Sequence, residues 1–208
     1  MPAPFRPNDT ALVLIDHQVG TMQLIKTLDV TDVKRFTLAM AKCARLLGMP
    51  IILTADQEDH IQGPLLPEFA DIIPEAYAAR INRPGIVNAW DDARFVAAIE
   101  KTGCRNLLMA GVTTDVCLIF PAISAVEAGY RVQAMLDISG SPFVVSEETA
   151  RNRMERAGVE FTATNTAIAE LVQDWSSSDG EKLLPTLFQE ILPPVHAPLA
   201  AVAAGARH

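Results

Sequence analysis

The sequence predicts an α/β fold of three αβα layers, with a six-stranded, mostly parallel, doubly wound (Rossmann-like) sheet between two layers of helices. The first observation is that short apolar runs alternate along the chain with segments whose apolar residues recur every three or four positions. Strands that alternate with helices in this way form βαβ units and a parallel sheet. The second is that 208 residues, half of them hydrophobic, are enough to bury a full core without disulfides or structural metals.

Six strands are expected in chain order. They lie at residues 11–15, 50–54, 79–82, 106–110, 131–136 and 159–162. The first and fourth runs, ALVLI and NLLMA, are apolar rather than alternating, which is typical of central strands that helices cover on both faces.

Three helices are expected between these strands. The first has an apolar stripe from Val33 to Leu47 and ends at Gly48, where glycine favours helix termination. The second follows Asp91, and the third begins at Ser146, where acidic residues favour the first turn. Each of these segments is long enough to connect two parallel strands.

The segment after the sixth strand departs from this pattern. Residues 1–175 are expected to form one domain, and the serine-rich stretch 176–180 is expected to be a linker. Beyond it, an apolar stripe at helical spacing indicates one more helix: Leu183, Leu184, Leu187, Phe188 and Ile191. Such a stripe needs a surface to cover it, and either the domain itself or a neighbouring subunit would provide one. We interpret residues 176–208 as a linker, helix and tail that make contacts in an oligomer.

Charge and composition disfavour several classes of function. Twenty-five acidic against seventeen basic residues give a net charge of −8, which disfavours binding to nucleic acid or to an anionic membrane surface. No apolar run reaches the roughly 18 residues of a membrane span, and the start of the chain lacks the pattern of a signal peptide, so we expect a cytoplasmic protein. The cysteines Cys43, Cys104 and Cys117 match neither a disulfide framework nor zinc-site spacing, which leaves room for one functional thiol.

Three residues near the ends of strands are candidates for chemistry. Asp16 follows the first strand, Arg83 follows the third, and Cys117 lies after the fourth, where a new helix begins. Ligands of open parallel sheets bind outside the carboxyl ends of the strands, where the winding reverses. In the common strand order 3-2-1-4-5-6 the first and fourth strands are neighbours at that point, so Asp16 and Cys117 share a crevice. Arg83 is two strand spacings away, about 10 Å, within reach of a long side chain.

The chemistry that these three side chains support together is acyl transfer. A thiol near a helix N-terminus is activated when a carboxylate can take its proton and a cation favours the thiolate. Backbone N–H groups in the turn at residues 112–117 can hold an oxyanion. Taken singly, each residue also has an ordinary interpretation: Cys117 as core packing, Asp16 as a cap, and Arg83 as a solvated ion-pair partner.

Three stretches of the chain carry a resemblance to a known family: DHQ after the first strand, RPGIVNAW after the third, and AGVTTDVCLIFPAISAVEAGYRV after the fourth. Over most of its length the chain resembles the isochorismatase-like cysteine hydrolases, and more closely their YcaC-type members. The resemblance implies a triad of acidic base, basic residue and cysteine nucleophile at Asp16, Arg83 and Cys117. It also implies a cis peptide bond between Val112 and Thr113, an oxyanion hole formed by the backbone N–H groups of Thr113 and Cys117, and an octamer of two stacked rings.

Two features of the chain differ from the pattern of that superfamily. Most members have lysine where this chain has Arg83, although the YcaC-type members resemble this chain there. An arginine does not release its proton in proteins, so proton transfer is expected to depend on Asp16 alone. Nicotinamidase-like members bind a metal through an Asp-x-His…His set, whereas the stretch 54–69 offers only Asp56 and His60. We therefore expect neither a metal ion nor another cofactor.

The sequence thus predicts a cysteine hydrolase that cleaves a small amide, or a related C–N bond of a small-molecule substrate, through a thioester intermediate. His17, Asn88, Trp90 and Phe120 are candidates for lining the pocket. Two alternatives stay open: an isochorismatase-type vinyl ether hydrolase that uses Asp16 without the cysteine, and a catalytically idle member that serves as an oligomeric scaffold. Only the first interpretation requires a reactive Cys117.

Overall fold

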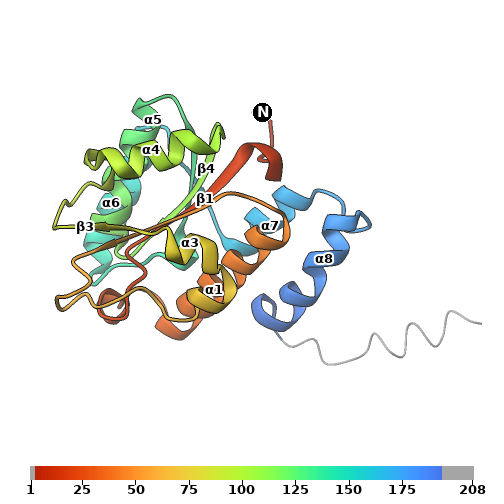
Figure 1. Ribbon diagram of the computed structural model, residues 1–208, viewed down its shortest axis with the longest axis horizontal. Helices are drawn as coiled ribbons and strands as arrows, with labels where there is room; N and C mark the ends of the chain where they lie inside the picture. Colours follow the sequence, from red (N-terminus) through yellow and green to blue (C-terminus); the bar gives the residue numbers. More distant parts are fainter. Residues whose placement is uncertain (1–2, 194–208) are drawn as a thin grey trace, which may run out of the picture.

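A computed structural model describes residues 3–193 and contains three layers, with helices on both faces of one sheet (Figure 1). The sheet has six strands in the order β3-β2-β1-β4-β5-β6, and every neighbouring pair is parallel. This is the doubly wound order, which reverses its winding between β1 and β4. The predicted fold class is therefore confirmed, with a sheet that is wholly parallel.

The predicted strands are all present, with ends that shift by a few residues. The strands are β1 Thr10–Ile15, β2 Ile51–Asp56, β3 Ile81–Arg83, β4 Asn106–Gly111, β5 Arg131–Met135 and β6 Glu160–Thr162. The third strand was expected from residue 79, but Ala79 and Arg80 close the helical turn before it through hydrogen bonds from their N–H groups. Arg83 consequently ends β3 instead of following it.

The helices include the three expected ones and several more. They are α1 Val30–Leu46, α2 Phe69–Ile72, α3 Pro74–Ala78, α4 Ala93–Thr102, α5 Ile119–Glu127, α6 Val144–Arg156, α7 Thr164–Val172 and α8 Ser178–Thr186. Two π-helical turns, Thr114–Leu118 and Leu187–Ile191, extend α5 and α8.

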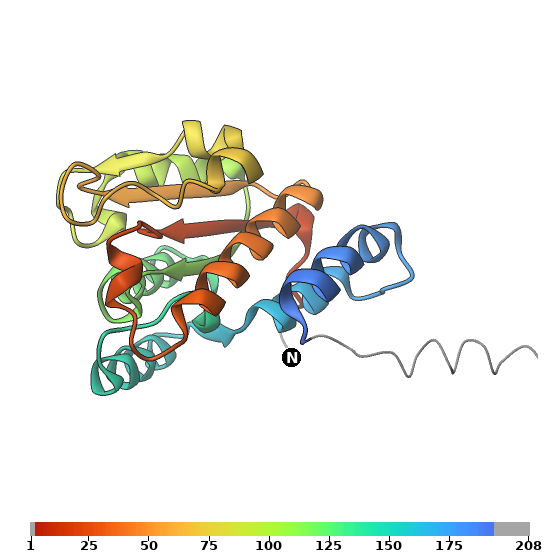
Figure 2. The ribbon, with the colours of Figure 1, turned by 90° about the horizontal axis from the view of Figure 1, so that it is seen from below.

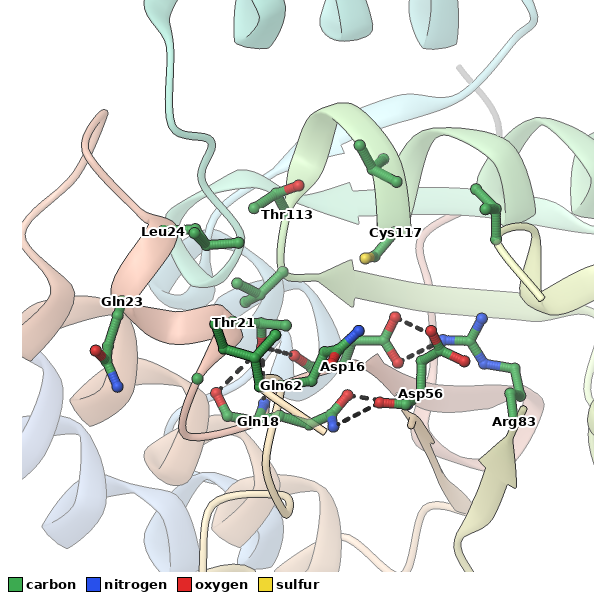
Figure 3. Close-up of a pocket in the computed structure, with 15 residues that line it drawn as sticks. Asp16, Gln18, Thr21, Gln23, Leu24, Asp56, Gln62, Arg83, Thr113 and Cys117 are labelled. Carbon is green, nitrogen blue, oxygen red and sulfur yellow. Dashed lines mark hydrogen bonds and ion pairs between the residues drawn. The ribbon is translucent and has the colours of Figure 1, made fainter. Parts of the chain in front are cut away.

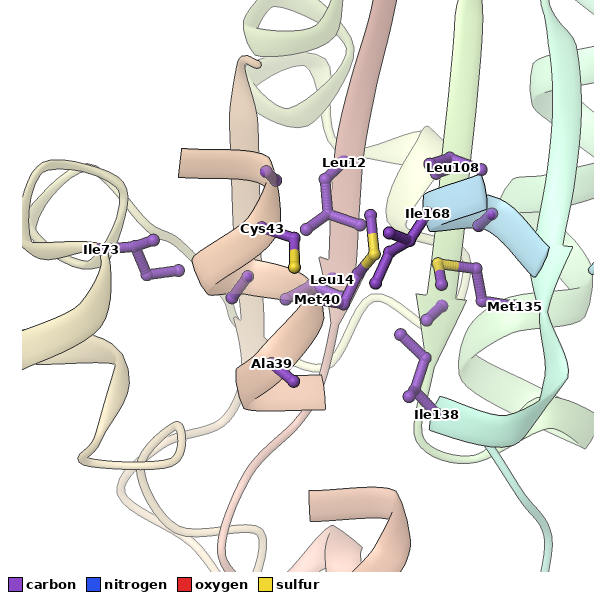
Figure 4. Packing of buried hydrophobic residues seen from close by; sticks show 14 of the residues in the cluster. Leu12, Leu14, Ala39, Met40, Cys43, Ile73, Leu108, Met135, Ile138 and Ile168 are labelled. Atoms are coloured by element: carbon purple, nitrogen blue, oxygen red, sulfur yellow. The ribbon is translucent and has the colours of Figure 1, made fainter. Parts of the chain in front are cut away.

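Two apolar clusters enclose the sheet, and β1 contributes to both because its side chains alternate between the faces. Leu12 and Leu14 belong to the cluster on the side of α1 and α7, whereas Ala11, Val13 and Ile15 belong to the cluster on the side of α4, α5 and α6. Figure 4 shows part of the first cluster, and Figure 2 shows α1 lying across that face. Every residue of β1 is buried, as expected for a central strand.

The C-terminal helix packs against its own domain. Leu183, Leu187 and Ile191 are buried in the cluster that contains α1, and α8 lies beside α1 (Figure 2). Leu183, Leu187 and Ile191 are therefore covered within the same chain, whereas Phe188 of the predicted stripe is 51% exposed. The expected domain boundary after residue 175 stays a prediction. A role of this segment in oligomer contacts stays a prediction, and the expected tail at 194–208 lies outside the described residues.

Within residues 3–193, no helix combines the length and the apolar composition that crossing a membrane requires.

Candidate functional site

Asp16 occupies the end of β1 in a left-handed backbone conformation, with φ of 57°. Aspartate is one of the few non-glycine residues that adopt this conformation readily. Its backbone is fixed on both sides: the N–H donates to the Thr54 carbonyl at 2.9 Å, and the carbonyl accepts from the Gln18 N–H at 2.7 Å and from the Thr21 hydroxyl at 2.5 Å. The tight turn after β1 therefore fixes the direction of the Asp16 carboxylate.

Arg83 reaches this carboxylate from β3, two strands away. Its Nη2 lies 2.5 Å from both carboxylate oxygens of Asp16, and each of the two residues is only 2% exposed. The remaining guanidinium nitrogens are also occupied, since Nε donates to the Thr54 hydroxyl at 3.0 Å and Nη1 donates to the Ile86 carbonyl. All three nitrogens of the guanidinium are thus committed within the protein.

Cys117 lies in the π-helical turn that follows β4, and its thiol points at the Asp16 carboxylate (Figure 3). The turn packs closely over the strand that precedes it. A Cβ atom at Gly111 would come within 3.2 Å of the Cys117 carbonyl carbon, so a residue with a side chain there would push the turn away. The Thr114 hydroxyl and N–H bind the Gly140 backbone at 2.7 and 2.8 Å, which ties the turn to the segment after β5.

Burial governs the electrostatics of the Asp16 and Cys117 pair. Removal from water raises the pKa of Asp16 above its ordinary value, while the charge and hydrogen bond of Arg83 act in the opposite direction. Burial also raises the pKa of the Cys117 thiol well above its usual range, and the negative charge of Asp16 raises it further. Both influences favour the protonated thiol at Cys117, in contrast to the preformed thiolate that a helix N-terminus and Arg83 would favour.

The peptide bond between Val112 and Thr113 is cis. Within residues 3–193 the Thr113 N–H has no backbone partner, and it lowers the pKa of Cys117, so it faces the sulfur. The Cys117 N–H instead donates to the Thr113 carbonyl at 2.8 Å. Of the two N–H groups expected for an oxyanion hole, only that of Thr113 is available in this structure.

These residues surround a cavity of about 450 Å³ at the carboxyl edge of the sheet. Such a volume lies at the lower end of the range for small-molecule sites. The polar lining consists of Asp16, Gln18, Thr21, Gln23, Asp56, Gln62, Arg83, Thr113 and Cys117, and the apolar lining of Leu24, Ile61, Val87, Val112 and Val116, with Gly20 between them. The structure thus brings the three predicted residues to one cavity.

Four other predicted pocket residues lie outside it. His17 is fully buried, and its Nε2 bonds the Ile138 carbonyl at 2.8 Å. Asn88 caps a short helical turn, and Trp90 packs edge-on against two aromatic rings. Phe120 packs below an arginine guanidinium. Each of these four side chains thus contacts a neighbouring element instead of the cavity.

Sequence reasoning missed two kinds of lining residue. Gln18 and Asp56 are polar contributors from the ends of β1 and β2, and Asp56 was weighed only as a metal ligand. Its potential partner His60 borders a separate surface depression. Within residues 3–193 no three His, Cys, Asp or Glu side chains are grouped for metal binding, and metal independence stays a prediction. The apolar residue Leu24 ends a short 3-10 helix, Thr21–Leu24, and Ile61 lies in a loop, and neither segment is long enough to show periodicity in the sequence.

Residues 10–166 match the isochorismatase domain family. The chain is 37% identical over 187 residues to "Probable hydrolase YcaC" of Escherichia coli (strain K12), with 89% of this chain and 88% of the relative covered. The structure of YcaC from Pseudomonas aeruginosa with hexane-2,5-diol and covalent acrylamide is similar, with a TM-score of 0.87, 35% identity and coverage of 99% and 98%. The Escherichia coli YcaC structure is described as an octameric hydrolase of unknown specificity. It matches with a TM-score of 0.86 and 34% identity, and the match covers 98% of this chain and 95% of that chain. The chain therefore belongs to the isochorismatase family, in its YcaC-like group of hydrolases.

Proposed function

We propose that this protein hydrolyses a small amide, or a related C–N bond, through a thioester on Cys117. One observation carries the proposal: Asp16 contacts both the buried guanidinium of Arg83 and the thiol of Cys117, at the wall of a cavity sized for a small molecule. A carboxylate that touches a thiol can take its proton, and a fixed cation keeps that carboxylate in place.

The first half of the reaction forms the thioester. Asp16 accepts the thiol proton while the Cys117 sulfur attacks the carbonyl carbon, and the carbonyl π electrons move to the oxygen. The Thr113 N–H donates to that oxyanion, as oxyanion holes do in acyl transfer. The C–N bond then breaks, the thioester remains on Cys117, and protonated Asp16 returns the proton to the leaving nitrogen.

The second half releases the acid. Asp16, again a carboxylate, takes a proton from water as the water oxygen attacks the thioester. The C–S bond breaks, and the proton passes from Asp16 to the departing Cys117 thiolate. Because Asp16 must be ionised at the start of both halves, activity should fall as the pH drops through its pKa. Burial raises that pKa, so the decline begins above the range of an ordinary aspartate.

The vinyl ether alternative fits the cavity less well. Isochorismate is a dicarboxylate and needs cationic partners. Arg83 is the one cation among the residues that line this cavity, and Thr54, Ile86 and Asp16 occupy its guanidinium. Asp16 and Asp56 would also repel a dianion. The charges of the lining therefore favour a substrate without carboxylates.

Alkylation followed by mass spectrometry tests the nucleophile. Acrylamide or iodoacetamide should modify Cys117 first, because its residue is partly exposed and its thiol contacts Asp16, whereas Cys43 and Cys104 are buried. Cys43 and Cys104 thus serve as internal controls. Slower modification of Cys117 than of both controls would contradict the assignment.

A substrate panel tests the reaction itself. Small amides, carbamoyl compounds and esters are incubated with the protein, and release of amine, ammonia or acid is measured. Cys117→Ala is the matched blank, because the thiol is the group that forms the intermediate. Turnover that survives in Cys117→Ala would assign the chemistry to Asp16 alone, and a wholly inactive panel with an unreactive thiol would favour the scaffold interpretation.

We also propose that the chain forms a homo-oligomer, as an octamer. The proposal rests on the octameric Escherichia coli YcaC, which the chain resembles over nearly its whole length. Light scattering coupled to size exclusion should give eight chains per particle, and a monomer in solution would contradict it.

A further inference from the structure

We propose that Asp56 is a specificity-determining residue whose carboxylate binds a cationic N–H donor of the substrate, such as a protonated amine or an amidinium. The inference rests on the proposed function and narrows its substrate to a small amide that carries one positive charge. Asp56 takes no part in the proton transfers between Asp16 and Cys117.

The fold positions Asp56 beside the reacting groups. It ends β2, where its Cα is the register partner of the Arg83 Cα on β3, and its carboxylate is close enough to raise the pKa of Asp16. Both residues line the same cavity as Cys117. The Gln18 amide clamps the Asp56 backbone, since Oε1 accepts from its N–H and Nε2 donates to its carbonyl, both at 2.9 Å (Figure 3).

One carboxylate oxygen of Asp56 is held and the other is left to the cavity. Oδ1 accepts the Gly85 N–H at 2.7 Å. Gly85 has a φ of +109°, which favours glycine, and a Cβ there would lie 3.0 Å from the Gln57 side-chain nitrogen. Within residues 3–193, Oδ2 has no hydrogen-bond partner, although Asp56 is half-buried at the cavity wall. A held carboxylate with one uncommitted oxygen is a preformed acceptor for a ligand donor.

The formal charge of the lining selects a cation. Counted by formal charge at neutral pH, the Asp16 carboxylate contributes one negative charge to the lining and the Cys117 thiol contributes none. Arg83 contributes a positive charge and Asp56 a second negative one, which leaves the lining at −1. A monocationic ligand neutralises this charge, while an anion adds to it in a partly desolvated site.

A metal ion is a poorer match to the same carboxylate. Metal sites need several converging ligands, and within the described chain no group of three or more His, Cys, Asp or Glu side chains converges. A single carboxylate is instead suited to an organic ammonium. Gln62 Oε1, which has no hydrogen-bond partner within residues 3–193, can accept one of the remaining N–H donors of that ligand.

Three amides of similar shape test the inference by NMR titration of the Cys117→Ser variant, which cannot form the thioester. The probes are glycinamide as the cation, propionamide as the neutral isostere and malonamate as the anion. Glycinamide should bind at least about tenfold more tightly than either of the others, which is the size expected for one charge facing another at a partly exposed site.

Asp56→Asn should abolish this preference, because an asparagine oxygen still accepts the Gly85 N–H while the negative charge is lost. Asp59→Asn is the matched control, since it removes the same charge from an exposed residue that does not line the cavity, and it should leave the preference unchanged. If Asp56→Asn fails to fold, the effect of salt on the Cys117→Ser protein is measured instead. Adding about 0.5 M NaCl should reduce the difference in affinity between glycinamide and propionamide, because salt screens charge interactions.

Each failure has its own signature. Equal or tighter binding of malonamate, or a preference that neither Asp56→Asn nor salt alters, overturns the role of Asp56 even if Cys117 is reactive and hydrolyses neutral amides. A charge preference that depends on Asp56 in a protein whose Cys117 does not react supports the subsite and overturns the proposed hydrolysis instead.

Discussion

Cys43, which is buried in the apolar layer, and Cys117, which lines the cavity, show how two thiols in one chain differ in their surroundings. Cys43 lies in the apolar layer between α1 and the sheet (Figure 4), where burial raises the pKa of its thiol to about 12. Burial raises the pKa of Cys117 as well, but Asp16 lies in hydrogen-bond contact with it. Burial alone leaves a thiol inert, whereas burial next to a base leaves a proton that can move within the site without passing through water.

The largest expected effect comes from removing that base. Asp16→Asn keeps the left-handed backbone, which asparagine also adopts readily, but it cannot accept a proton. Turnover of the best amide in the panel should fall by roughly 10²–10⁴-fold, the range of general acid–base catalysis. Asp59→Asn, which removes an exposed charge, should retain activity.

The same variant should make the thiol easier to ionise. The charge of Asp16 raises the pKa of Cys117, so its removal should shift iodoacetamide labelling of Cys117 to lower pH while hydrolysis is lost. Loss of labelling and turnover together would show that Asp16 acts on the shape of the site, and unchanged turnover would exclude it as the base.

The second effect concerns the buried ion pair. Arg83→Ala leaves the Asp16 carboxylate without its partner in a desolvated site, and the free energy of unfolding should fall by about 3–5 kcal/mol. Arg94→Ala breaks a pair with Asp92 in which the Arg94 side chain is 62% exposed, so its cost in unfolding free energy should be much smaller. Urea unfolding of the two variants measures the difference, and equal costs would contradict a structural role for the buried pair.

Arg83→Lys separates charge from geometry. Lysine keeps the positive charge but loses the planar fork, so its activity should lie between those of the wild-type protein and Arg83→Ala. Arg83→Ala should also raise the pH at which Cys117 is alkylated, because Arg83 lowers the pKa of that thiol. If Arg83→Lys is as inactive as Arg83→Ala while Asp16→Asn stays active, Arg83 is a substrate clamp and the proton route is wrong.

A smaller effect is expected in the apolar layer. Leu183→Ala truncates a fully buried side chain between α8 and α1 and should lower the free energy of unfolding by about 3–4 kcal/mol, with kcat unchanged. Leu46→Ala makes the same chemical change at a side chain that is 40% exposed and should cost much less. If Leu183→Ala lowered kcat strongly while its free energy of unfolding stayed at the wild-type value, the apolar layer at α8 and the cavity around Cys117 would be coupled.

The smallest effect concerns His17, which is fully buried between Asp16 and Ile138 of the apolar layer. Burial lowers its pKa to about 4, below its unfolded value of 6.5, so the unfolded chain takes up the proton first. The stability that neutral His17 allows is therefore complete above about pH 6.5 and declines as the pH falls to about 4, by about 3 kcal/mol in total. His17→Gln keeps a donor for the Ile138 carbonyl. In this variant the free energy of unfolding, measured with urea, should depend less on pH between about 6.5 and 4. An unchanged pH dependence would show that other groups cause the acid sensitivity.

The sequence by itself determined the order of elements and the approximate place of the candidate site residues. Alternating apolar runs and helical stripes encode local structure, because backbone periodicity decides which side chains are buried. Asp16, Arg83 and Cys117 could be predicted at one edge, because parallel strands in a doubly wound sheet place their carboxyl ends together.

The tertiary structure decided what each of these groups contacts. The Cys117 N–H is used within its own turn, Gln18 and Gly85 hold Asp56 at the cavity, and Leu183 is buried in the cluster that contains α1. None of these contacts has a sequence signal, because each joins residues that are distant in sequence or depends on loop geometry without periodicity. Proton affinity likewise follows burial and neighbouring charge, which exist only once the chain has folded.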